Sequence, residues 1–299
     1  MGNIISAIIL GLIQGLTEFF PISSSGHLLV LPELIEALGA DLDFSFQNTE
    51  FDLALHTGTF LAILFFYRDR FIQAFKQLKS NKGKLFFRNL AITSTPALAI
   101  GGVMYVTGVG KEQSSLLASI TLIIGGLMLI VIEHYINRNE KEREGSSQLS
   151  NNNNPQGDID LVANISAKSA LIIGLFQSIA LIRGVSRSGA TMIGGFTQKL
   201  SRLQALDYAF IASIPVFFMG TLIEFLQFIK EFLEFGTNAN EGRLANLEGL
   251  IAGSIASFIS GFIVIYFFRK IINYKNSLKI FGFYRIVLGL IILSLIFPR

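Results

Sequence analysis

Hydrophobic residues along this chain gather into runs separated by short polar stretches, and the lengths of the runs predict a helical membrane protein. There are ten runs, at residues 3–20, 27–38, 50–67, 87–106, 114–137, 165–182, 189–198, 207–229, 247–269 and 281–298. A helix needs about 20 apolar residues to cross a bilayer. The runs 27–38 and 189–198 are too short to do so.

Each short run follows a polar break, PISSSG at 21–26 or RGVSRSG at 183–189. Non-helical backbone is tolerated at membrane depth only when it is buried in protein or lines a wet cavity. We therefore expect two re-entrant helix pairs, 3–38 and 165–198, each entering and leaving on one side. The other six runs would span, which predicts an all-α integral membrane protein with six transmembrane helices and two re-entrant pairs.

The composition agrees with this fold class. Hydrophobic residues make up 51% of the 299 residues and charged residues only 15%, whereas a soluble protein has about 25% charged residues. The chain has no cysteine, which excludes disulfides and thiolate chemistry. The first run lacks the basic n-region and the small-residue cleavage site of a signal peptide, so we expect it to be retained rather than cleaved. We expect membrane lipids, and no nucleic acid, as partners.

One low-complexity stretch divides the chain. The sequence NRNEKEREGSSQLSNNNNPQGD at 137–158 is polar and rich in asparagine, which is typical of a flexible linker. We place the linker at 138–164, between halves of about 1–137 and 165–299. The chain is then a single polytopic membrane domain made of two halves.

The two halves carry a weak internal repeat. GLIQGLTEFFPISSSG at 11–26 aligns without a gap on GLFQSIALIRGVSRSG at 174–189, with six identities in sixteen positions. Each half would hold one re-entrant pair and three spans. Three is odd, so the second half is predicted to be inverted. Inverted repeats with broken helices place their sites near the midplane, where the repeats meet.

The distribution of Lys and Arg orients this arrangement. The loops around 68–86, 138–164, 199–206 and 269–280 would share one side and hold fifteen of these residues; the other side would hold four. Cytoplasmic loops carry the excess of positive charge. We therefore expect the N-terminus, the loop near Asp41 and Asp43, and the C-terminus to lie outside the cytoplasm.

The first polar break has the residues of an anion site. Pro21 ends the preceding helix, since proline cannot continue it. Ser23, Ser24, Ser25 and Gly26 then offer hydroxyls and backbone N–H groups at a helix start, where phosphate binds well. Serine is also a good N-cap, so this break alone is equally compatible with simple capping.

The second break adds a cation. Arg187 lies within an apolar half, where charge is rare and usually functional, and arginine is a natural bidentate partner of phosphate. The alternative is a structural ion pair with Glu18. Arg183 is less clear, because it could also reach the membrane interface.

A carboxylate and an amide lie on one helix face just before the first break. Gln14 and Glu18 are four residues apart. A carboxylate facing a phosphate would repel it unless a divalent cation, Mg²⁺ or Ca²⁺, bridged the two. Alternatively Glu18 orients His27, and Gln14 serves helix packing.

Among the three histidines, His27 directly follows the serines, so we favour an acid–base or nucleophilic role for it over a structural one. His56 and His134 have no comparable polar cluster beside them in the sequence. Asp52 and the segment 57–59 are weaker candidates to line the cavity.

Together these stretches resemble a known family. QGLTEFFPISSSGH at 14–27 and GVSRSGAT at 184–191 are similar to the two signature regions of the bacterial undecaprenyl-diphosphatase family of the bacitracin-resistance type. The matching positions are Gln14, Glu18, Pro21, Ser23, Ser24, Gly26 and His27 in the first region and Gly184, Ser186, Arg187, Ser188 and Gly189 in the second. One position departs from the family pattern: Arg183 stands where proline is usual, and it adds a charge near the substrate.

The resemblance implies a membrane phosphatase that converts undecaprenyl diphosphate to undecaprenyl phosphate, recycling the lipid carrier of cell-wall synthesis. It also implies a divalent cation and a site open to the periplasmic side of the bacterial inner membrane. We assign Ser24, His27, Glu18 and Arg187 as catalytic, and Glu18 and Gln14 as metal ligands. The remaining predicted substrate-binding residues are Ser23, Ser25, Gly26, Ser186, Ser188, Gly189 and Thr191.

Two questions remain open at this level, the attacking group and the function. Ser24 activated by His27 attacks phosphorus, or His27 activates a water. A polyprenyl-phosphate transporter or flippase is the competing function, since inverted repeats with broken helices are common in transporters. A second lipid phosphatase superfamily, with a PSGH signature, is excluded because it needs a downstream histidine and none follows His134. The sequence leaves the oligomeric state open, with a homodimer as one candidate.

Overall fold

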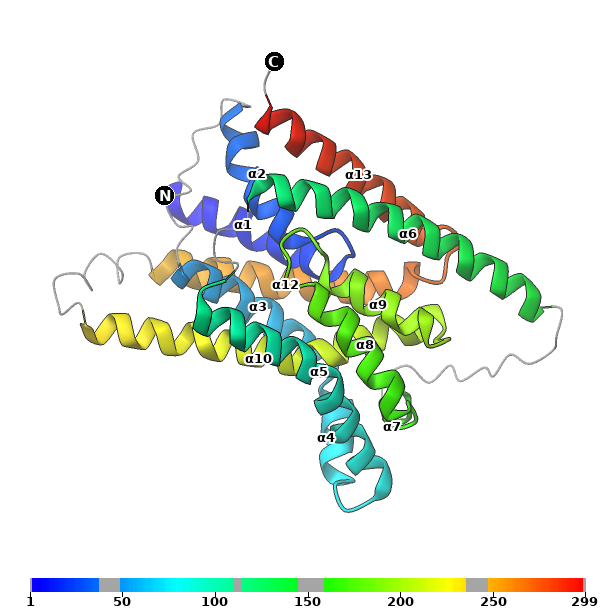
Figure 1. Ribbon diagram of the computed structural model, residues 1–299. Coiled ribbons are helices and arrows are strands. Elements are labelled where there is room, and N and C mark those ends of the chain that lie inside the picture. The colour runs from blue at the N-terminus through cyan, green and yellow to red at the C-terminus, as the bar shows by residue number, and fades with distance from the viewer. Residues whose placement is uncertain (1, 38–48, 110–113, 145–158, 235–246, 298–299) are drawn as a thin grey trace.

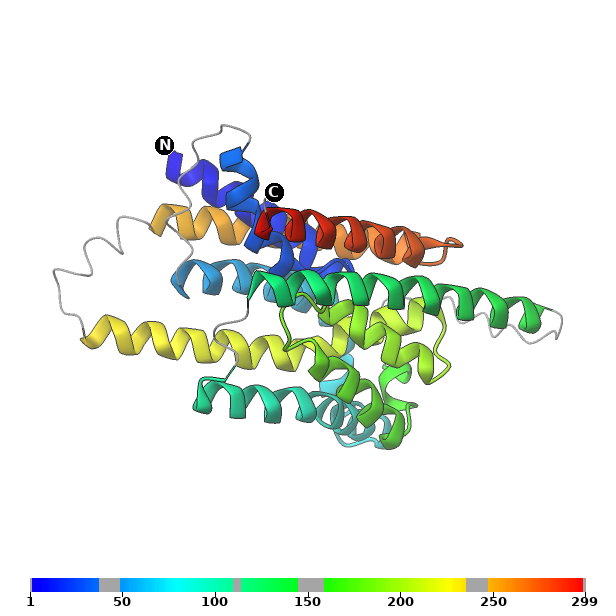
Figure 2. The ribbon, with the colours of Figure 1, turned by 45° about the horizontal axis from the view of Figure 1, so that its top comes forward.

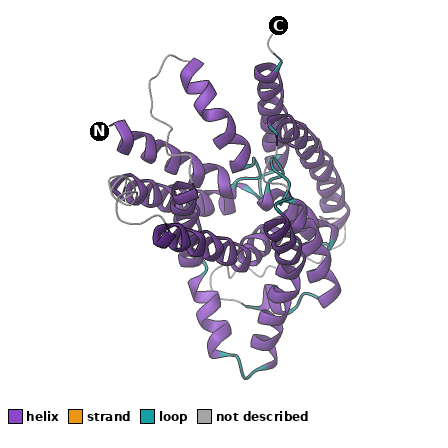
Figure 3. Ribbon diagram, turned by 60° about the vertical axis from the view of Figure 1, so that its left-hand side comes forward, coloured by secondary structure: helices purple, strands orange, loops and turns teal. Residues whose placement is uncertain are grey.

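The protein is helical. The computed structural model describes residues 2–37, 49–109, 114–144, 159–234 and 247–297, and within these ranges it contains helices and no strand (Figure 3). The first half holds α1 (Gly2–Phe19), α2 (Ser24–Ala37), α3 (Thr49–Phe66), α4 (Arg68–Lys76), α5 (Asn81–Thr107) and α6 (Ser115–Glu144). The second half holds α7 (Asp160–Ala163), α8 (Ala167–Ile179), α9 (Arg187–Thr197), α10 (Arg202–Glu234), α12 (Leu247–Ile271) and α13 (Ser277–Ile296).

The long apolar helices confirm the predicted class of fold. Five of the described helices, α5, α6, α10, α12 and α13, are long and apolar enough to cross a membrane. The sixth predicted span corresponds to α3, which is a shorter apolar helix. The predicted re-entrant pairs appear as α1 with α2 and α8 with α9, each interrupted at the expected polar break.

Two short helices and one extension were not predicted. The helices α4 and α7 lie in stretches without a long apolar run, so hydrophobicity alone gave no signal for them. In addition, α6 continues to Glu144, so helix occupies the start of the predicted linker and α7 lies near its end. Residues 145–158, the centre of that linker, lie outside the described residues.

The outward faces of the helices are apolar. Val131 on α6 and Ile280 on α13 are each 69% exposed, and many other large apolar side chains on these helices are exposed as well. Apolar surface of this extent on helices of spanning length is the surface of a protein solvated by lipid. The chain is therefore a multi-pass membrane protein.

The helix contacts follow the inverted repeat. Counted along the chain from the aligned segments, and leaving out the short α4, the helices α1, α2, α3, α5 and α6 correspond to α8, α9, α10, α12 and α13. The helix α1 packs on α12, and correspondingly α8 packs on α5. Likewise α3 packs on α12 and α10 on α5, while α6 and α13 run side by side (Figure 1 and Figure 2). Each half thus completes the packing of the other.

Equivalent glycines allow two of these close contacts. A Cβ atom on Gly11 of α1 would collide with the carbonyl oxygen of Gly253 on α12. At the equivalent position, a Cβ on Gly174 of α8 would collide with the carbonyl oxygen of Thr93 on α5. Small residues let membrane helices approach closely. The repeat therefore preserves the spacing that brings the two re-entrant pairs together.

Buried ion pairs anchor the start of α10. Asp207 binds Arg70 at 2.8 Å and Arg269 at 2.7 Å, while Arg202 binds Glu133 at 2.8 Å. Buried charges require such partners. These pairs connect α10 to α4, α12 and α6 at the end of the bundle that the charge distribution predicts to be cytoplasmic.

Candidate active site

The two broken turns meet inside the bundle. The backbone N–H of Gly184 donates to Ser25 Oγ at 3.3 Å, and Ser188 Oγ donates to the carbonyl oxygen of Phe20 at 3.1 Å. Each bond joins one half of the repeat to the other. The N-termini of α2 and α9 are therefore held beside one another, as the sequence predicts for a site where the repeats meet.

Arg285 on α13 fastens the turns together. Its guanidinium donates to the carbonyl oxygens of Pro21 at 3.2 Å and Gly184 at 3.0 Å, one from each turn. It also donates to the carbonyls of Thr121 and Leu122 on α6. The side chain is buried, with only 2% of the residue exposed. One cation thus satisfies carbonyl groups that the interrupted helices leave without partners.

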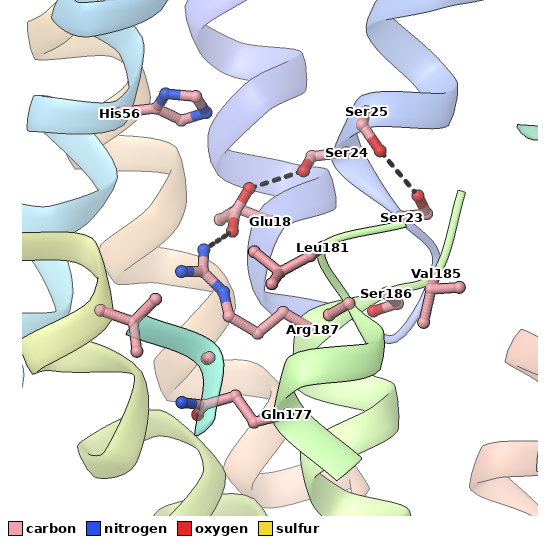
Figure 4. Close-up of a pocket in the computed structure, with 13 residues that line it drawn as sticks. Glu18, Ser23, Ser24, Ser25, His56, Gln177, Leu181, Val185, Ser186 and Arg187 are labelled. Atoms are coloured by element: carbon pink, nitrogen blue, oxygen red, sulfur yellow. Dashed lines mark hydrogen bonds and ion pairs between the residues drawn. The ribbon is translucent and has the colours of Figure 1, made fainter. Parts of the chain in front are cut away.

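Glu18 lies at the centre of the site. Its Oε1 accepts a hydrogen bond from Arg187, and its Oε2 accepts from Ser24 Oγ at 2.6 Å and from Gln14 Nε2 at 3.1 Å. Figure 4 shows the carboxylate between Ser24 and Arg187, with one bond to each. The ion pair considered as an alternative role for Arg187 is therefore formed. It connects the first half of the chain to the second.

Arg187 still has donors for a further ligand. Its side chain is 22% exposed, and within the described residues its guanidinium makes one hydrogen bond, from Nη2 to Glu18. The guanidinium lies 3.4 Å from the ring centroid of Phe217, a cation–π contact that fixes its plane. Arg187 is also the first residue of α9, whose N-cap Ser186 accepts from the N–H of Gly189 at 3.3 Å.

The turn before α2 has an unusual backbone. Ser23 has φ of 70°, a left-handed conformation that is uncommon for residues other than glycine. Its hydroxyl lies 3.2 Å from that of Ser25. Such conformations are held only where the surrounding structure imposes them, commonly at functional sites. The turn places Ser24 as the first residue of α2, directed towards Glu18.

Two adjacent cavities open around these groups. The first, here the Arg187 cavity, has a volume of about 210 Å³ and is lined by Glu18, Arg187 and Gln177, among others. The second, here the Arg183 cavity, has a volume of about 300 Å³ and is lined by Gln14, Asp52 and Arg183, among others. Ser24, Ser25 and His56 line both. Each cavity could hold several waters, at about 30 Å³ each.

Not every predicted site residue lines these cavities. Ser23 and Ser186 line the Arg187 cavity. The predicted residues that line neither cavity are Gly26, His27, Ser188, Gly189 and Thr191. Instead, Ser188 bonds to Phe20 as described, and Thr191 Oγ1 donates to the carbonyl oxygen of Arg187 at 2.8 Å. Ser188 and Thr191 therefore hold the start of α9 in place and do not line either cavity.

His27 faces away from Ser24. Its Nδ1 lies 2.8 Å from the carbonyl oxygen of Ser23, and its Nε2 lies 2.7 Å from the hydroxyl of Tyr284, on which the imidazole stacks. Both ring nitrogens are therefore engaged. The predicted pairing of Ser24 with His27 is not formed in this arrangement, and Glu18 occupies the place beside the Ser24 hydroxyl.

Comparison with known proteins identifies the family. The model of the bacitracin resistance protein BacA family matches residues 7–291, a range that contains both turns and all the site residues described above. The chain belongs to this family. It is 33% identical over 295 residues to the undecaprenyl-diphosphatase of Wolinella succinogenes, covering 97% of each chain. It is 32% identical over 286 residues to that of Aquifex aeolicus, covering 95% of each, and 31% identical over 291 residues to that of Persephonella marina, covering 97% and 98%.

In this member of the BacA family, the site has few oxygen atoms that could bind the predicted divalent cation. The described residues hold no group of three or more His, Cys, Asp and Glu side chains that could bind a metal ion. However, Gln14 Oε1 is buried without a hydrogen-bond partner in the described structure, beside the carboxylate of Glu18. One or two oxygen ligands fit Mg²⁺ held mainly by substrate phosphates and water. The donors therefore suit a cation that arrives with the substrate.

Sequence reasoning overlooked two parts of the site. Arg285 lies in the apolar run 281–298, and Glu224 lies in the apolar run 207–229, where it pairs with His56 on α3 at 3.4 Å. An ionisable residue within a membrane helix is a strong signal of function. That rule was applied to Arg187 and would have found both. The partner His56 became evident only when α3 and α10 were placed side by side.

Proposed function

We propose that this protein hydrolyses undecaprenyl diphosphate to undecaprenyl phosphate and inorganic phosphate, and so recycles the lipid carrier of cell-wall synthesis. Membership of the bacitracin-resistance family and the names of its relatives support this activity. The observation that carries it here is the 2.6 Å contact between Ser24 Oγ and Glu18, beside Arg187. A hydroxyl in contact with a carboxylate base, and next to an arginine that can bind phosphate, is the arrangement expected of a phosphoryl-transfer enzyme.

Ser24 would act as the nucleophile. Glu18 accepts the proton of the Ser24 hydroxyl as Oγ attacks the terminal phosphorus, and undecaprenyl phosphate leaves with the bridging oxygen. The free N–H groups at the starts of α2 and α9 and the guanidinium of Arg187 bind the phosphate oxygens and stabilise their developing charge. Water then hydrolyses the phosphoserine, which releases inorganic phosphate and restores Ser24.

The earlier alternative, in which His27 activates a water directly, is less favoured. Both nitrogens of His27 have protein partners, and its side chain lines neither cavity. We assign His27 instead to holding the turn of Ser23 against Tyr284. A positioning role of this kind still predicts reduced activity when His27 is replaced.

A divalent cation, Mg²⁺ or Ca²⁺, would complete the site. Glu18 and Gln14 Oε1 are the protein oxygens that would hold it, as the orphaned amide oxygen suggests. When bound, such a cation neutralises charge on the phosphate oxygens. Glu18 would then hold the cation in addition to accepting hydrogen bonds from Arg187, Ser24 and Gln14.

We further propose that the site opens to the periplasmic side of the inner membrane. The Arg183 cavity is lined by Leu10 of α1 and by Phe51 and Leu55 of α3, which lie in the first halves of these helices, towards the side that the Lys and Arg count places outside. Reporter tags at residues 80, 150 and 275 should lie in the cytoplasm, and tags at 45 and 238 outside. A periplasmic signal from the tag at 150 would contradict this topology.

Release of phosphate from C55 diphosphate by the purified protein tests the activity. We expect release by wild type, loss of most of it in Ser24→Ala, and inhibition by EDTA. A transporter of polyprenyl phosphates with no hydrolytic function would release no phosphate. That result would favour the competing function, because inverted repeats are also found in transporters.

A further inference from the structure

A second acid–histidine pair lies at the side of the site. His56 on α3 directs Nδ1 to Glu224 Oε1 on α10 at 3.4 Å. Figure 4 shows the His56 ring on the opposite side of the cavity from Ser24, above the Glu18 carboxylate. Unlike His27, His56 lines both cavities, and 38% of its side chain is exposed.

The environment of Glu224 suggests more than a contact between helices. Glu224 Oε2 and, one turn before it, Thr221 Oγ1 are buried without a hydrogen-bond partner in the described structure. Both belong to the apolar helix α10, where an ionisable side chain is costly and usually functional. A carboxylate bound to one imidazole nitrogen fixes the ring so that the other nitrogen can face a ligand.

The position of His56 matches the middle of a diphosphate. The Arg187 cavity and the Arg183 cavity each contain one arginine, and His56 lies where they join, together with Ser24. A diphosphate consists of two phosphate groups joined by one oxygen. With the terminal phosphate at Arg187 and the lipid-linked phosphate at Arg183, the bridging oxygen comes to the junction of the two cavities. Arginine at 183, in place of the family's usual proline, fits this second subsite.

We propose that His56, oriented by Glu224, is the acid that protonates the bridging oxygen of the substrate. The inference rests on the proposed phosphatase activity and adds a catalytic residue to it. As the bond from Ser24 Oγ to the terminal phosphorus forms, the bond from that phosphorus to the bridging oxygen breaks. The electron pair stays on this oxygen, which receives the proton of His56 Nε2 and leaves within undecaprenyl phosphate.

The second half of the reaction returns the proton. Water attacks the phosphoserine, His56 accepts a proton from that water, and the proton held by Glu18 returns to Ser24 Oγ as the Ser24–phosphorus bond breaks. One water is consumed, and Glu18 and His56 regain their starting protonation states.

The charged and titratable groups that surround His56, from every element facing it, are Asp52 on α3, Glu224 on α10, Glu18 on α1, Arg183 in the turn and Arg187 on α9.

Steady-state hydrolysis of C55 diphosphate by His56→Ala, measured as kcat and KM across pH, tests the inference. Loss of a general acid–base group lowers kcat by about 10²–10⁴-fold, and we expect KM to change little. The alkaline limb of the kcat profile should disappear. Glu224→Gln should lower kcat less, and the double variant should match His56→Ala alone, because the two residues act as one unit.

Controls separate this role from a structural one. His134→Ala removes another histidine, exposed on α6, and should keep wild-type kcat. His56→Gln retains a polar side chain that can still bond Glu224. Wild-type kcat in this variant would show that the pair of His56 and Glu224 serves only as a contact between helices. That result, or an unchanged pH profile in a folded His56→Ala, overturns the inference while phosphate release by wild type still upholds the proposed function. Absence of release by wild type instead refutes the function itself.

Discussion

Ser24 and Arg187 occupy equivalent positions in the two halves of the chain, and they bind opposite oxygens of one carboxylate, that of Glu18. The gapless alignment of 11–26 with 174–189 places Ser24 on Arg187 and Glu18 on Leu181. The two turns have therefore diverged to supply complementary groups. The first half gives the hydroxyl and the base, and the second gives the cation.

Glu18→Gln should lower kcat by about 10²–10⁴-fold, because the amide cannot accept the proton of Ser24. Ser24→Ala should lose at least as much, and the double variant scarcely more, since the pair acts as a unit. Phosphate release from C55 diphosphate measures all three. Ser119→Ala, which removes a buried hydroxyl that donates to a carbonyl in α6, is the matched control. Near wild-type turnover in Ser24→Ala would exclude the serine nucleophile.

Arg187→Lys should lower kcat by about 10²-fold, as loss of one preorganised donor does. Lysine retains the charge and can still pair with Glu18, but it loses the planar fork and the stacking on Phe217. The variant should remain folded in detergent. Arg68→Lys, at an exposed position, should leave kcat unchanged. Wild-type kinetics in a folded Arg187→Lys would limit Arg187 to the structural ion pair.

Removal of divalent cations with EDTA should abolish phosphate release, and Mg²⁺ should restore it. Gln14→Leu should raise the Mg²⁺ concentration needed for half-maximal activity, because it removes the buried oxygen beside Glu18. Its effect on thermal unfolding should be small, since Gln14 makes one side-chain hydrogen bond in the described structure. Full turnover after exhaustive metal removal would contradict the cation proposal.

Arg285→Met should destabilise the protein by several kcal/mol, at about 1–3 kcal/mol for each buried carbonyl left unpaired. The carbonyls of Pro21 and Gly184, one in each broken turn, lose their partner, whereas those of Thr121 and Leu122 lie within α6 and keep their helix hydrogen bonds. Thermal unfolding in detergent measures the loss, and kcat should fall with it as the turns separate. Tyr284→Phe, one residue earlier, removes only the hydroxyl that contacts His27 and should cost far less. Equal stability in both variants would argue against the clamp.

Glu133→Leu and Arg202→Leu should each lower the free energy of unfolding by about 3–5 kcal/mol, because each leaves a buried charge without its partner. The double variant should lose much less than the sum, since no unpaired charge remains. Neither residue lines the Arg187 or Arg183 cavity, so kcat of the folded fraction should not change. A strictly additive double variant would show that the pair contributes little.

The sequence allowed much of the fold to be predicted because lipid imposes simple rules. Run length separated spanning from re-entrant helices, and the repeat around Gly11 and Gly174 anticipated which segments meet. The short helix α4 escaped because it lies outside any long apolar run and is stabilised by contacts such as that of Arg70 with Asp207, which is distant in sequence. The hydrophobicity pattern cannot predict a contact between residues so far apart in the sequence.

The site was predicted less completely, and His27 and His56 show why. His27 adjoins the serines in sequence, but the start of α2 rotates it towards Tyr284. His56 is distant in sequence, but the packing of α3 beside α1 and α10 brings it to the cavities. Proximity along the chain indicates which turn is functional. It does not determine which side chains face one another, because that depends on helix rotation.

The exchange of partners between the halves has a consequence for biosynthesis. Because α1 packs on α12, α1 receives this partner only after the whole of the first half and α10 have been made, while α8 finds α5 already in the bilayer. The first re-entrant pair must therefore stay in the membrane with Gly11 and Gly15, the residues that face α12, uncovered until α12 emerges. A chain truncated at the linker would lack α12 altogether. Two fragments divided there should regain activity only when both are made in the same membrane, where each supplies the missing wall of the other.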